Sequence, residues 1–273
     1  ASVTKQFTAA GVLLLAERGV LAVSDPVARW IDGGPPAWDE ITLHHLITHS
    51  AGMAHWQHMP DLDLARPLPA GQKLRAFAAA PLLSPPGERF SYSSPGFVLL
   101  AHVIERAARQ PYGDFLAQEI FGPLGMTGTF DGSPRGRPDV AVGHENREPV
   151  PSFDLDTLGL GTGSIWSTVG DLARWDRALA VGDILSAASR QAMFTPHVPV
   201  AEDDGLIRTE AYGYGWFIAT AAGRRLFYHP GDNHGFRSVN AWFPDDEVRA
   251  VVLSNEHATD IEPVAHDLIR QAF

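Results

Sequence analysis

The sequence contains no cysteine among its 273 residues. This absence excludes disulfide bonds, thiolate zinc sites and a cysteine nucleophile. Long hydrophobic runs are missing as well, since the apolar stretch over residues 11–16 is far too short to span a bilayer. No secretory signal peptide is recognisable, and none of these absences decides the cellular compartment.

Positive charge is scarce relative to negative charge. Lys and Arg total 21 against 32 Asp and Glu, which gives a formal net charge of -11. This balance argues against nucleic acid or an anionic membrane surface as the main partner, and it leaves a small-molecule substrate open. Hydrophobic residues make up 45% and charged residues 19%, so the chain has an ordinary globular composition. Its length suits one large domain or two lobes that share a cleft.

The first two thirds of the chain are predicted to be mainly helical. Apolar spacing and helix-ending residues predict helices over residues 2–18, 24–30, 41–48, 95–109, 112–121 and 168–180. Residues 59–71, with three prolines, are predicted to form a surface loop or lid. Residues 133–153 are polar and rich in turn residues, without a clear period.

The last quarter of the chain changes character. Strands are expected over residues 214–220, 225–229, 236–243 and 249–254, with a turn at 244–247 and a closing helix over 261–273. Helices followed by an antiparallel sheet predict the α+β class.

The first candidate chemical element is Ser2-Val3-Thr4-Lys5. Residues three apart on a helix share one face, so the Ser2 hydroxyl and the Lys5 amine are expected to meet. A lysine can remove the serine proton when burial lowers its pKa toward neutrality. The backbone N–H groups at a helix start can also stabilise an oxyanion. Alone, the S-x-x-K pattern is weak evidence, because it occurs by chance in most long chains.

The second element is Tyr92-Ser93-Ser94, which follows a Pro-Gly break and precedes an apolar helix. A tyrosine close to a lysine ammonium is expected to have a lowered phenol pKa and could then shuttle protons to a leaving group. The alternative is an ordinary buried aromatic residue with a satisfied hydroxyl.

The third element is His229-Pro230-Gly231, at the end of an expected strand. Small residues there would let a substrate lie along the strand edge, and the N–H of Asp232 is a candidate oxyanion donor. Arg237 is a candidate for attracting a substrate carboxylate. The alternative reading of His229 is a hydrogen-bonded core or surface residue.

Together, in this order, S-x-x-K, Y-x-S and H-x-G resemble the three motifs of the serine β-lactamase and penicillin-binding protein superfamily. The H-x-G form is similar to the class C β-lactamase-related branch, which also holds esterases and D-amino-acid peptidases. Further segments that are similar to landmarks of this branch cover residues 2–30, 41–53, 85–100, 121–127, 161–175 and 212–216. The resemblance therefore extends over nearly the whole chain.

The resemblance implies a β-lactamase/transpeptidase-like fold over residues 1–273. An antiparallel sheet flanked by helices (about residues 1–24 and 205–273) would face an all-helical lobe (about 25–180), with the active site in the cleft between them. The family's usual N-terminal helix and two strands have no counterpart before Ala1. The sheet over 214–254 is therefore expected to lack neighbouring strands. An omitted upstream segment, a cleaved segment that stays bound, or self-association would each cover its edge.

The resemblance also implies roles for the candidate residues. Ser2 would be the nucleophile, Lys5 and Tyr92 would exchange protons, and His229 would replace the lysine of the third motif. The N–H groups of Ser2 and Asp232 would form the oxyanion hole, with Gly231 beside it, and no cofactor is implied. Two departures favour esters or weakly anchored amides. Ser94 stands where the family usually has asparagine, and His229 is neutral where a lysine is charged.

The leading hypothesis is an acyl-transfer hydrolase of a small ester, amide or peptide, resembling an esterase or a D-amino-acid peptidase. Two alternatives are a penicillin-binding sensor that acylates without turnover, and a true β-lactamase. A third is metal-dependent hydrolysis by the histidines at positions 44, 45, 49, 55 and 58. That cluster lacks the glutamate of an H-E-x-x-H motif, so no metal is expected.

Overall fold

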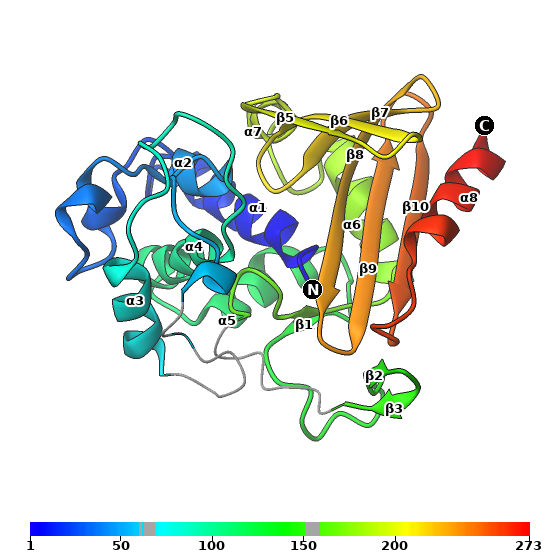
Figure 1. Ribbon diagram of the computed structural model, residues 1–273, viewed down its shortest axis with the longest axis horizontal. Coiled ribbons are helices and arrows are strands. Elements are labelled where there is room, and N and C mark those ends of the chain that lie inside the picture. The colour runs from blue at the N-terminus through cyan, green and yellow to red at the C-terminus, as the bar shows by residue number, and fades with distance from the viewer. Residues whose placement is uncertain (60–61, 63–68, 151–158) are drawn as a thin grey trace.

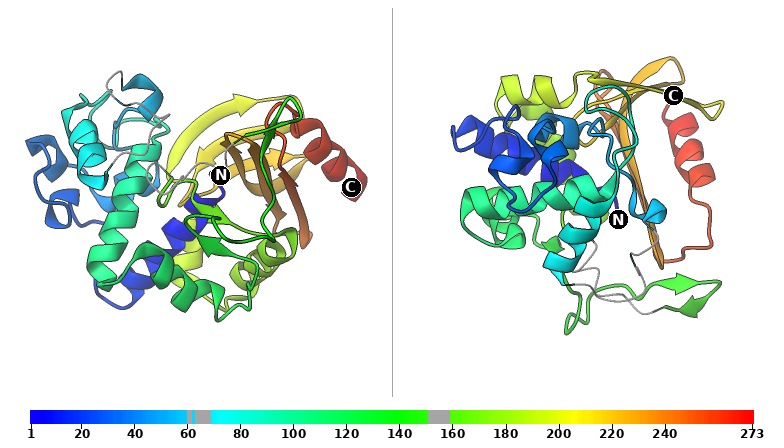
Figure 2. Two further views of the ribbon diagram at one scale, coloured as in Figure 1. Left: turned by 90° about the horizontal axis from the view of Figure 1, so that it is seen from below. Right: turned by 60° about the vertical axis from the view of Figure 1, so that its left-hand side comes forward.

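The computed structural model describes residues 1–59, 62, 69–150 and 159–273. The helices of the first half of the chain gather on one side, a broad sheet with later helices packed against it lies on the other, and the N-terminus lies between them (Figure 1; Figure 2, left). The described helices are α1 (Thr4–Glu17), α2 (Leu43–Ile47), α3 (Ala70–Ala79), α4 (Ser94–Ala108), α5 (Tyr112–Leu116), α6 (Val169–Val181), α7 (Ala187–Met193) and α8 (Glu262–Ala272). Single turns are η1 (Val27–Arg29), η2 (Pro36–Asp39), η3 (Trp56–His58) and η4 (Ala117–Phe121).

Within the described residues, the main sheet holds six antiparallel strands in the order β10-β9-β8-β7-β6-β5. The strands are β5 (Val198–Asp203), β6 (Ile207–Tyr212), β7 (Phe217–Ala221), β8 (Arg224–Asn233), β9 (Phe236–Phe243) and β10 (Val248–Ser254). Two small pairs lie outside this sheet: β1 (Phe130–Asp131) with β4 (Ile165–Trp166), and β2 (His144–Glu145) with β3 (Glu148–Pro149). The predicted α+β class is confirmed.

The sequence prediction missed several elements. It did not include α7, β5 or β6, and it treated residues 59–71 as a loop although α3 begins at Ala70. Most of that loop lies outside the described residues, as does the end of the turn-rich segment 133–153. The expectation that the sheet lacks neighbouring strands is wrong at β7, which pairs with β6. At the opposite border, no strand within the described ranges pairs with the outer side of β10.

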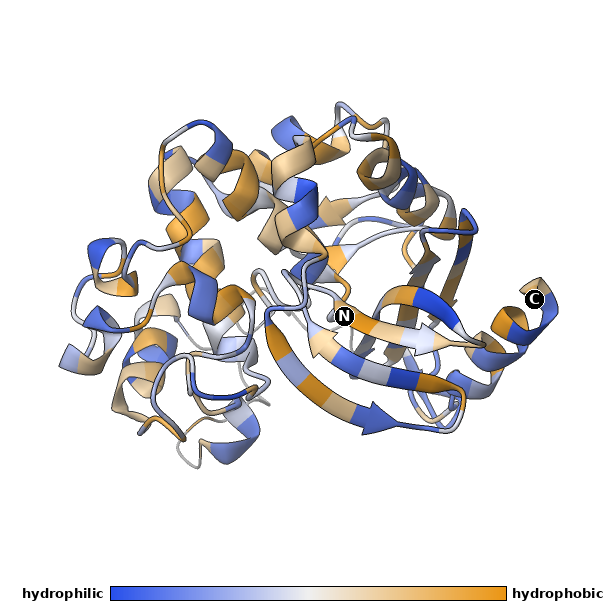
Figure 3. Ribbon diagram, turned by 90° about the horizontal axis from the view of Figure 1, so that it is seen from above, coloured by the Kyte–Doolittle hydropathy of each residue, from blue (hydrophilic) through white to orange (hydrophobic). Residues whose placement is uncertain are grey.

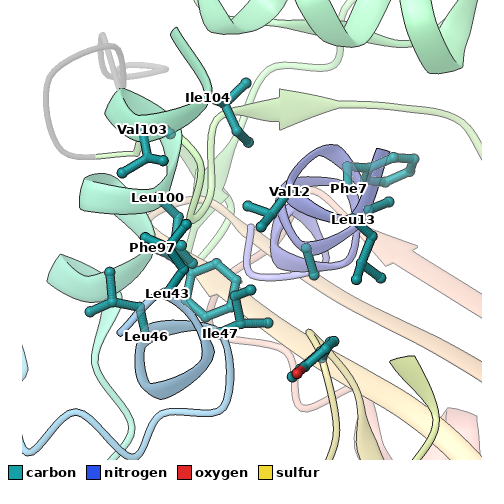
Figure 4. Close-up of a cluster of buried hydrophobic side chains, with 14 of the residues drawn as sticks. Phe7, Val12, Leu13, Leu43, Leu46, Ile47, Phe97, Leu100, Val103 and Ile104 are labelled. Carbon is teal, nitrogen blue, oxygen red and sulfur yellow. The ribbon is translucent and has the colours of Figure 1, made fainter. Parts of the chain in front are cut away.

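Helix α1 runs through the middle of the molecule and is buried around nearly its whole circumference. Val12 points toward the apolar side chains of α4 (Figure 4), whereas Phe7 lies on the opposite side of the helix and packs against Phe121 and Trp175, with ring centroids 5.6 and 4.5 Å away. Gly11 permits the contact with α4, because a Cβ there would lie 3.0 Å from Ile104 Cδ1 and 3.2 Å from Phe115 Cε1. Burying so much apolar surface fixes the position of the helix that carries Ser2 and Lys5.

The middle strands β7 and β9 are buried on both faces of the sheet. Because side chains alternate between the two faces of β9, Ala241 and Phe243 face α8, whereas Trp242 faces the larger core around α1. Toward its edge the sheet becomes more polar, and Figure 3 shows the alternation as orange and blue bands along β5 and β6. No described helix is both long enough and apolar enough to cross a lipid bilayer.

A polar network is buried beneath α1, where α6 and β9 meet it. Asn240 Nδ2 donates to Asp176 Oδ1 at 2.9 Å and to Gln6 Oε1 at 3.1 Å. Trp175 Nε1 also donates to Gln6 Oε1, at 3.2 Å. Burial raises the pKa of Asp176 to about 7, although the hydrogen bond from Asn240 and the charge of Arg249 oppose this. Within the described residues, Asp176 Oδ2 and Asn240 Oδ1 are buried without a hydrogen-bond partner, and a protonated carboxyl avoids an unpaired negative charge there.

This carboxyl is expected to make the stability of the protein depend on pH. Its folded-state pKa lies above the ordinary value of 3.8, so its stabilising contribution is complete below about pH 4 and is lost as the pH rises through about 7. The free energy of unfolding should therefore fall by about 4 kcal/mol over that window from this group. Asp176→Asn should flatten this part of the pH dependence, as measured by denaturant unfolding at pH 5 and pH 8.

The control for this experiment is Asp39→Asn, which changes an exposed aspartate. It should retain the wild-type pH dependence. An Asp176→Asn variant whose unfolding free energy varies with pH as the wild type does would contradict the assignment.

Candidate active site

Ser2 and Lys5 meet at the start of α1, as their spacing predicts. Lys5 Nζ lies 3.0 Å from Ser2 Oγ and donates to the carbonyl oxygen of Thr162 at 2.9 Å. The Lys5 side chain is completely buried. Burial lowers its pKa well below the ordinary lysine value. A neutral amine held at this distance can accept the proton of the Ser2 hydroxyl.

The polar face of α1 holds the segment around Thr162 in place. Thr8 Oγ1 donates to the carbonyl oxygen of Gly161 at 2.5 Å, and the Ile165 N–H donates to Thr4 Oγ1 at 3.1 Å. Thr4, Lys5 and Thr8 lie one helical turn apart or less, so one face of the helix makes all three contacts. This explains why buried polar residues stand on an otherwise apolar helix.

Tyr92 lies beside Lys5 and Ser2, although it comes from the loop before α4. Lys5 Nζ is 5.0 Å from the centroid of the Tyr92 ring, and the phenol is hydrogen-bonded with the Ser2 side chain. His49 fixes the loop on both sides of the tyrosine. The Ser91 N–H donates to the His49 carbonyl at 2.7 Å, and the Ser93 N–H donates to His49 Nδ1 at 3.1 Å. The imidazole then packs against the Tyr92 ring, with centroids 4.2 Å apart.

The prediction that Lys5 lowers the pKa of Tyr92 is wrong for this site. Burial raises the Tyr92 pKa, and the hydrogen bond with Ser2 offsets this only in part. The physical reason is that Lys5 shares the same buried environment, which favours the neutral amine and so removes the charge that would stabilise a phenolate. Tyr92 is therefore a neutral phenol that can donate a proton.

His229 lies at the same site but is already hydrogen-bonded on both ring nitrogens. Nδ1 is 2.6 Å from the carbonyl oxygen of Pro230, which can only accept, so this nitrogen carries the proton. Nε2 then accepts from the Tyr212 hydroxyl at 3.0 Å. Burial lowers the His229 pKa to about 3. The imidazole is neutral near pH 7 and does not supply the charge of a lysine at this position.

Gly231 allows strand β8 to approach the start of α1. A Cβ at this position would lie 2.8 Å from Ser2 N and 2.4 Å from Ser238 Oγ, closer than real Cβ contacts allow. The glycine therefore brings the strand backbone next to the Ser2 N–H. The pairing of this N–H with that of Asp232 as an oxyanion hole stays a prediction.

The side chains of Asp232 and Arg237 point into a charged cluster at the end of the β8–β9 hairpin. Asp232 accepts from His257 Nε2 at 2.7 Å and lies 3.6 Å from Arg237 Nη2. Glu145 completes the cluster, 3.5 Å from His257 Nδ1 and 3.1 Å from His234 Nε2. Arg237 keeps about a third of its side-chain surface exposed, and its charge is partly balanced by Asp232.

Ser94 opens helix α4, two residues after Tyr92. Its hydroxyl is 3.3 Å from Nε2 of His55, which also stacks on the Tyr92 ring. The other histidines of the proposed metal cluster point elsewhere. His44 is hydrogen-bonded with the Tyr214 hydroxyl at 2.8 Å, and His45 accepts from the Thr42 N–H. In the described part of the chain, no group of three or more His, Asp or Glu side chains is arranged to hold a metal ion.

A cavity of about 460 Å³ opens next to the site at Ala1. Its wall combines β9 with the segments around Phe130 and Trp166. Ala1 and Ser238 line it, but Lys5, Tyr92 and His229 do not. The cavity therefore adjoins the catalytic candidates without containing them.

Sequence reasoning missed several residues of the site. Thr162 contributes only a carbonyl oxygen, which no side-chain motif can reveal. His49 and His55 belonged to the sequence stretch considered for metal binding, and the only available signal was their position in a segment that resembles the family. Tyr212 was recognised only as the start of another such segment.

Comparisons with known proteins agree with the family resemblance seen in the sequence. The family model described as Beta-lactamase matches residues 1–272. Penicillin-binding protein 4* of Bacillus subtilis (strain 168) is 31% identical over 285 residues, covering 96% of this chain and 61% of the relative. The chain thus spans less than two thirds of that relative's length.

A second relative and a solved structure point the same way. The D-alanyl-D-alanine-carboxypeptidase/endopeptidase AmpH of Escherichia coli (strain K12) is 26% identical over 274 residues, covering 93% of this chain and 69% of the relative. The structure of D-amino acid amidase from Ochrobactrum anthropi SV3, complexed with D-phenylalanine, superposes with a TM-score of 0.84 at 26% identity. It covers 99% of this chain and 91% of that one.

Proposed function

Because this chain belongs to the β-lactamase family, we propose that it is a serine hydrolase that cleaves an ester or amide through an acyl-enzyme on Ser2. The observation that carries the proposal is the pairing of the Ser2 hydroxyl with a completely buried lysine at 3.0 Å. A buried lysine whose pKa is lowered is a base near neutral pH, and a serine hydroxyl needs such a base to become a nucleophile.

In the acylation step, the Ser2 Oγ–H proton passes to Lys5 Nζ while Oγ attacks the substrate carbonyl carbon. The N–H groups of Ser2 and Asp232 stabilise the oxyanion of the tetrahedral intermediate. The carbon–oxygen or carbon–nitrogen bond then breaks. The leaving group receives a proton from the Tyr92 hydroxyl, and the phenol recovers one from the Lys5 ammonium.

In the deacylation step, water attacks the Ser2 ester with Lys5 again as the proton acceptor. The Lys5 ammonium then returns the proton to Ser2 Oγ as the acyl carbon–oxygen bond breaks, so the serine hydroxyl reforms and the carboxylic acid leaves. Tyr92 suits the role of relay because its raised pKa keeps the phenol protonated between steps.

The surroundings of the site favour substrates without a strongly anchored carboxylate. His229 is neutral and both of its ring nitrogens are engaged. Arg237 already faces the carboxylate of Asp232. Esters and D-amino-acid amides that bind mainly through their acyl group therefore fit better than substrates that need a cationic clamp. Similarity to an amidase that is solved with D-phenylalanine supports the same class.

The proposal is tested by intact mass spectrometry together with a substrate panel. A fluorophosphonate probe should add one adduct to the wild type, and peptide mapping should place it on Ser2. p-Nitrophenyl esters, D- and L-amino-acid amides and a chromogenic cephalosporin then establish which bond is cleaved with turnover. A folded protein that takes no adduct would contradict the proposal. A stable cephalosporin adduct without turnover of any panel member would instead support a penicillin-binding sensor.

A further inference from the structure

The carbonyl oxygen that receives the Lys5 amine belongs to a tightly held backbone segment, residues 161–164. Four successive carbonyl oxygens of this segment each accept a hydrogen bond from outside it. The pairs are Thr8 Oγ1 with Gly161 at 2.5 Å, Lys5 Nζ with Thr162 at 2.9 Å, Asn233 Nδ2 with Gly163 at 3.0 Å, and Gly132 N with Ser164 at 3.2 Å. The Thr162 carbonyl is therefore fixed through its neighbours on both sides.

Asn233 supplies a bond that joins this segment to the main sheet. It is the last residue of β8 and pairs with Phe236 across the two-residue turn to β9. A Cβ on Gly163 would lie 3.1 Å from Asn233 Oδ1 and 3.3 Å from Nδ2, so the glycine gives the amide room to approach. The bond thereby ties the strand that carries His229 and Gly231 to the segment that receives Lys5.

The Thr162 carbonyl controls how the Lys5 amine faces Ser2. A neutral amine has two hydrogens and one lone pair, arranged at three positions around Nζ. The carbonyl oxygen can only accept, so it takes one of the hydrogens. This restricts rotation of the amine and lets its lone pair face the Ser2 hydroxyl, whose oxygen lies 3.0 Å away. A displaced carbonyl would turn the lone pair away from the proton that it must accept.

We infer that Asn233 is a positioning residue: by holding the Gly163 carbonyl, it fixes the neighbouring Thr162 carbonyl and so directs the Lys5 amine toward Ser2. This inference rests on the proposed function, in which Lys5 is the base. Asn233 acts through the backbone of another segment, so the sheet and the catalytic base are held as one unit.

The test uses Asn233→Ala and Asn233→Leu, which both remove the donor, while leucine keeps the volume of the side chain. Each variant should lower kcat by about 10- to 100-fold, the cost of a misplaced catalytic group. KM should stay near the wild-type value, because the change affects proton transfer and not ground-state binding. A folded variant with unchanged kcat would overturn the inference.

The pH profile distinguishes this role from general damage. A hydrogen bond to a carbonyl oxygen favours the ammonium form of a lysine, so loosening it lowers the Lys5 pKa further. The rise of kcat/KM with pH should then move to lower pH in both variants, whereas general damage lowers the rate without moving the rise. Burial keeps the titratable side chains that face Lys5 neutral near pH 7; these are His49, His55, Tyr92 and His229.

Asn255→Ala is the matched control. Asn255 Nδ2 also donates to a loop carbonyl, that of Val142, at 2.8 Å. Its removal costs the same kind of hydrogen bond without touching the segment 161–164, so kcat and the position of the rise should match the wild type. An equal rate loss in Asn255→Ala and Asn233→Ala, or a rise that does not move in the Asn233 variants, would contradict the positioning role.

A measurement that needs no turnover separates this inference from the proposed function. Lys5 and Lys73 are the only lysines in the sequence, so NMR of protein labelled with ¹³C at lysine Cε gives two signals, which Lys5→Met assigns. The Lys5 signal should titrate at lower pH in both Asn233 variants than in the wild type. If no ester or amide is hydrolysed, the proposed function fails, and this titration still decides whether Asn233 controls the Lys5 amine. An unchanged titration would overturn the inference whatever the activity.

Discussion

Ser2→Ala is expected to lower kcat/KM for any cleaved substrate by at least about 10³-fold, because it removes the nucleophile on which both proposed steps depend. The missing hydroxyl also eliminates the acyl-enzyme, so the probe adduct should disappear from the intact mass spectrum. Steady-state kinetics and mass spectrometry on the same samples give both results.

The fold should survive this change. Ser2 precedes α1, and the apolar contacts that hold the helix come from residues further along it, including Phe7 and Leu13. Circular dichroism and thermal unfolding should therefore match the wild type. Ser91→Ala is the control, since it removes a nearby serine hydroxyl and should keep both the adduct and the activity. Retained turnover in Ser2→Ala would rule out Ser2 as nucleophile.

Lys5→Met should have the second large effect. It should lower kcat/KM without lowering the melting temperature. The change preserves the length of the side chain and removes the amine. Loss of a general base lowers kcat/KM by about 10²- to 10⁴-fold. Among the residues that the structure describes, the buried amine is hydrogen-bonded only with the Ser2 hydroxyl and the Thr162 carbonyl, so an apolar replacement should leave the melting temperature unchanged or raise it.

Lys5→Arg and the pH profile separate a base from a mere positive charge. Arginine stays protonated, so activity should be lost if Lys5 acts as a base and retained if it supplies only charge. In the wild type, kcat/KM should rise with pH as Lys5 deprotonates and then level off. Because burial lowers the Lys5 pKa, this rise should occur well below 10.5, the ordinary lysine value. A rise centred near that value would contradict a buried neutral base.

Interactions that depend on short spacing were predictable from the sequence. Ser2 and Lys5 meet because residues three apart on a helix share a face, which requires nothing from the rest of the fold. Helix α4 follows from its apolar content and its start after Ser93. Strand β9 follows from a hydrophobic segment bounded by turn residues, and its bounds match the prediction.

The two missed strands show where local pattern fails. Strand β5 contains Pro199 and ends in Glu202 and Asp203, which are unfavourable in a central strand. They are tolerated because β5 is the border strand of the described sheet, and a border strand does not need every N–H for pairing. This segment forms a strand because it pairs with β6, and that pairing exists only in the folded protein.

The amino-acid sequence by itself determined the family resemblance, the α+β class and the candidate residues Ser2, Lys5, Tyr92 and His229. Only the tertiary structure decided the pKa shifts, the tautomers and the hydrogen-bond partners of the site residues. The pKa of Tyr92 rises because of burial, the tautomer of His229 follows from Pro230 and Tyr212, and His55 reaches Ser94 from a distant segment. Burial and hydrogen-bond partners are properties of packed surroundings, and residues far apart in the chain create them only when the chain folds.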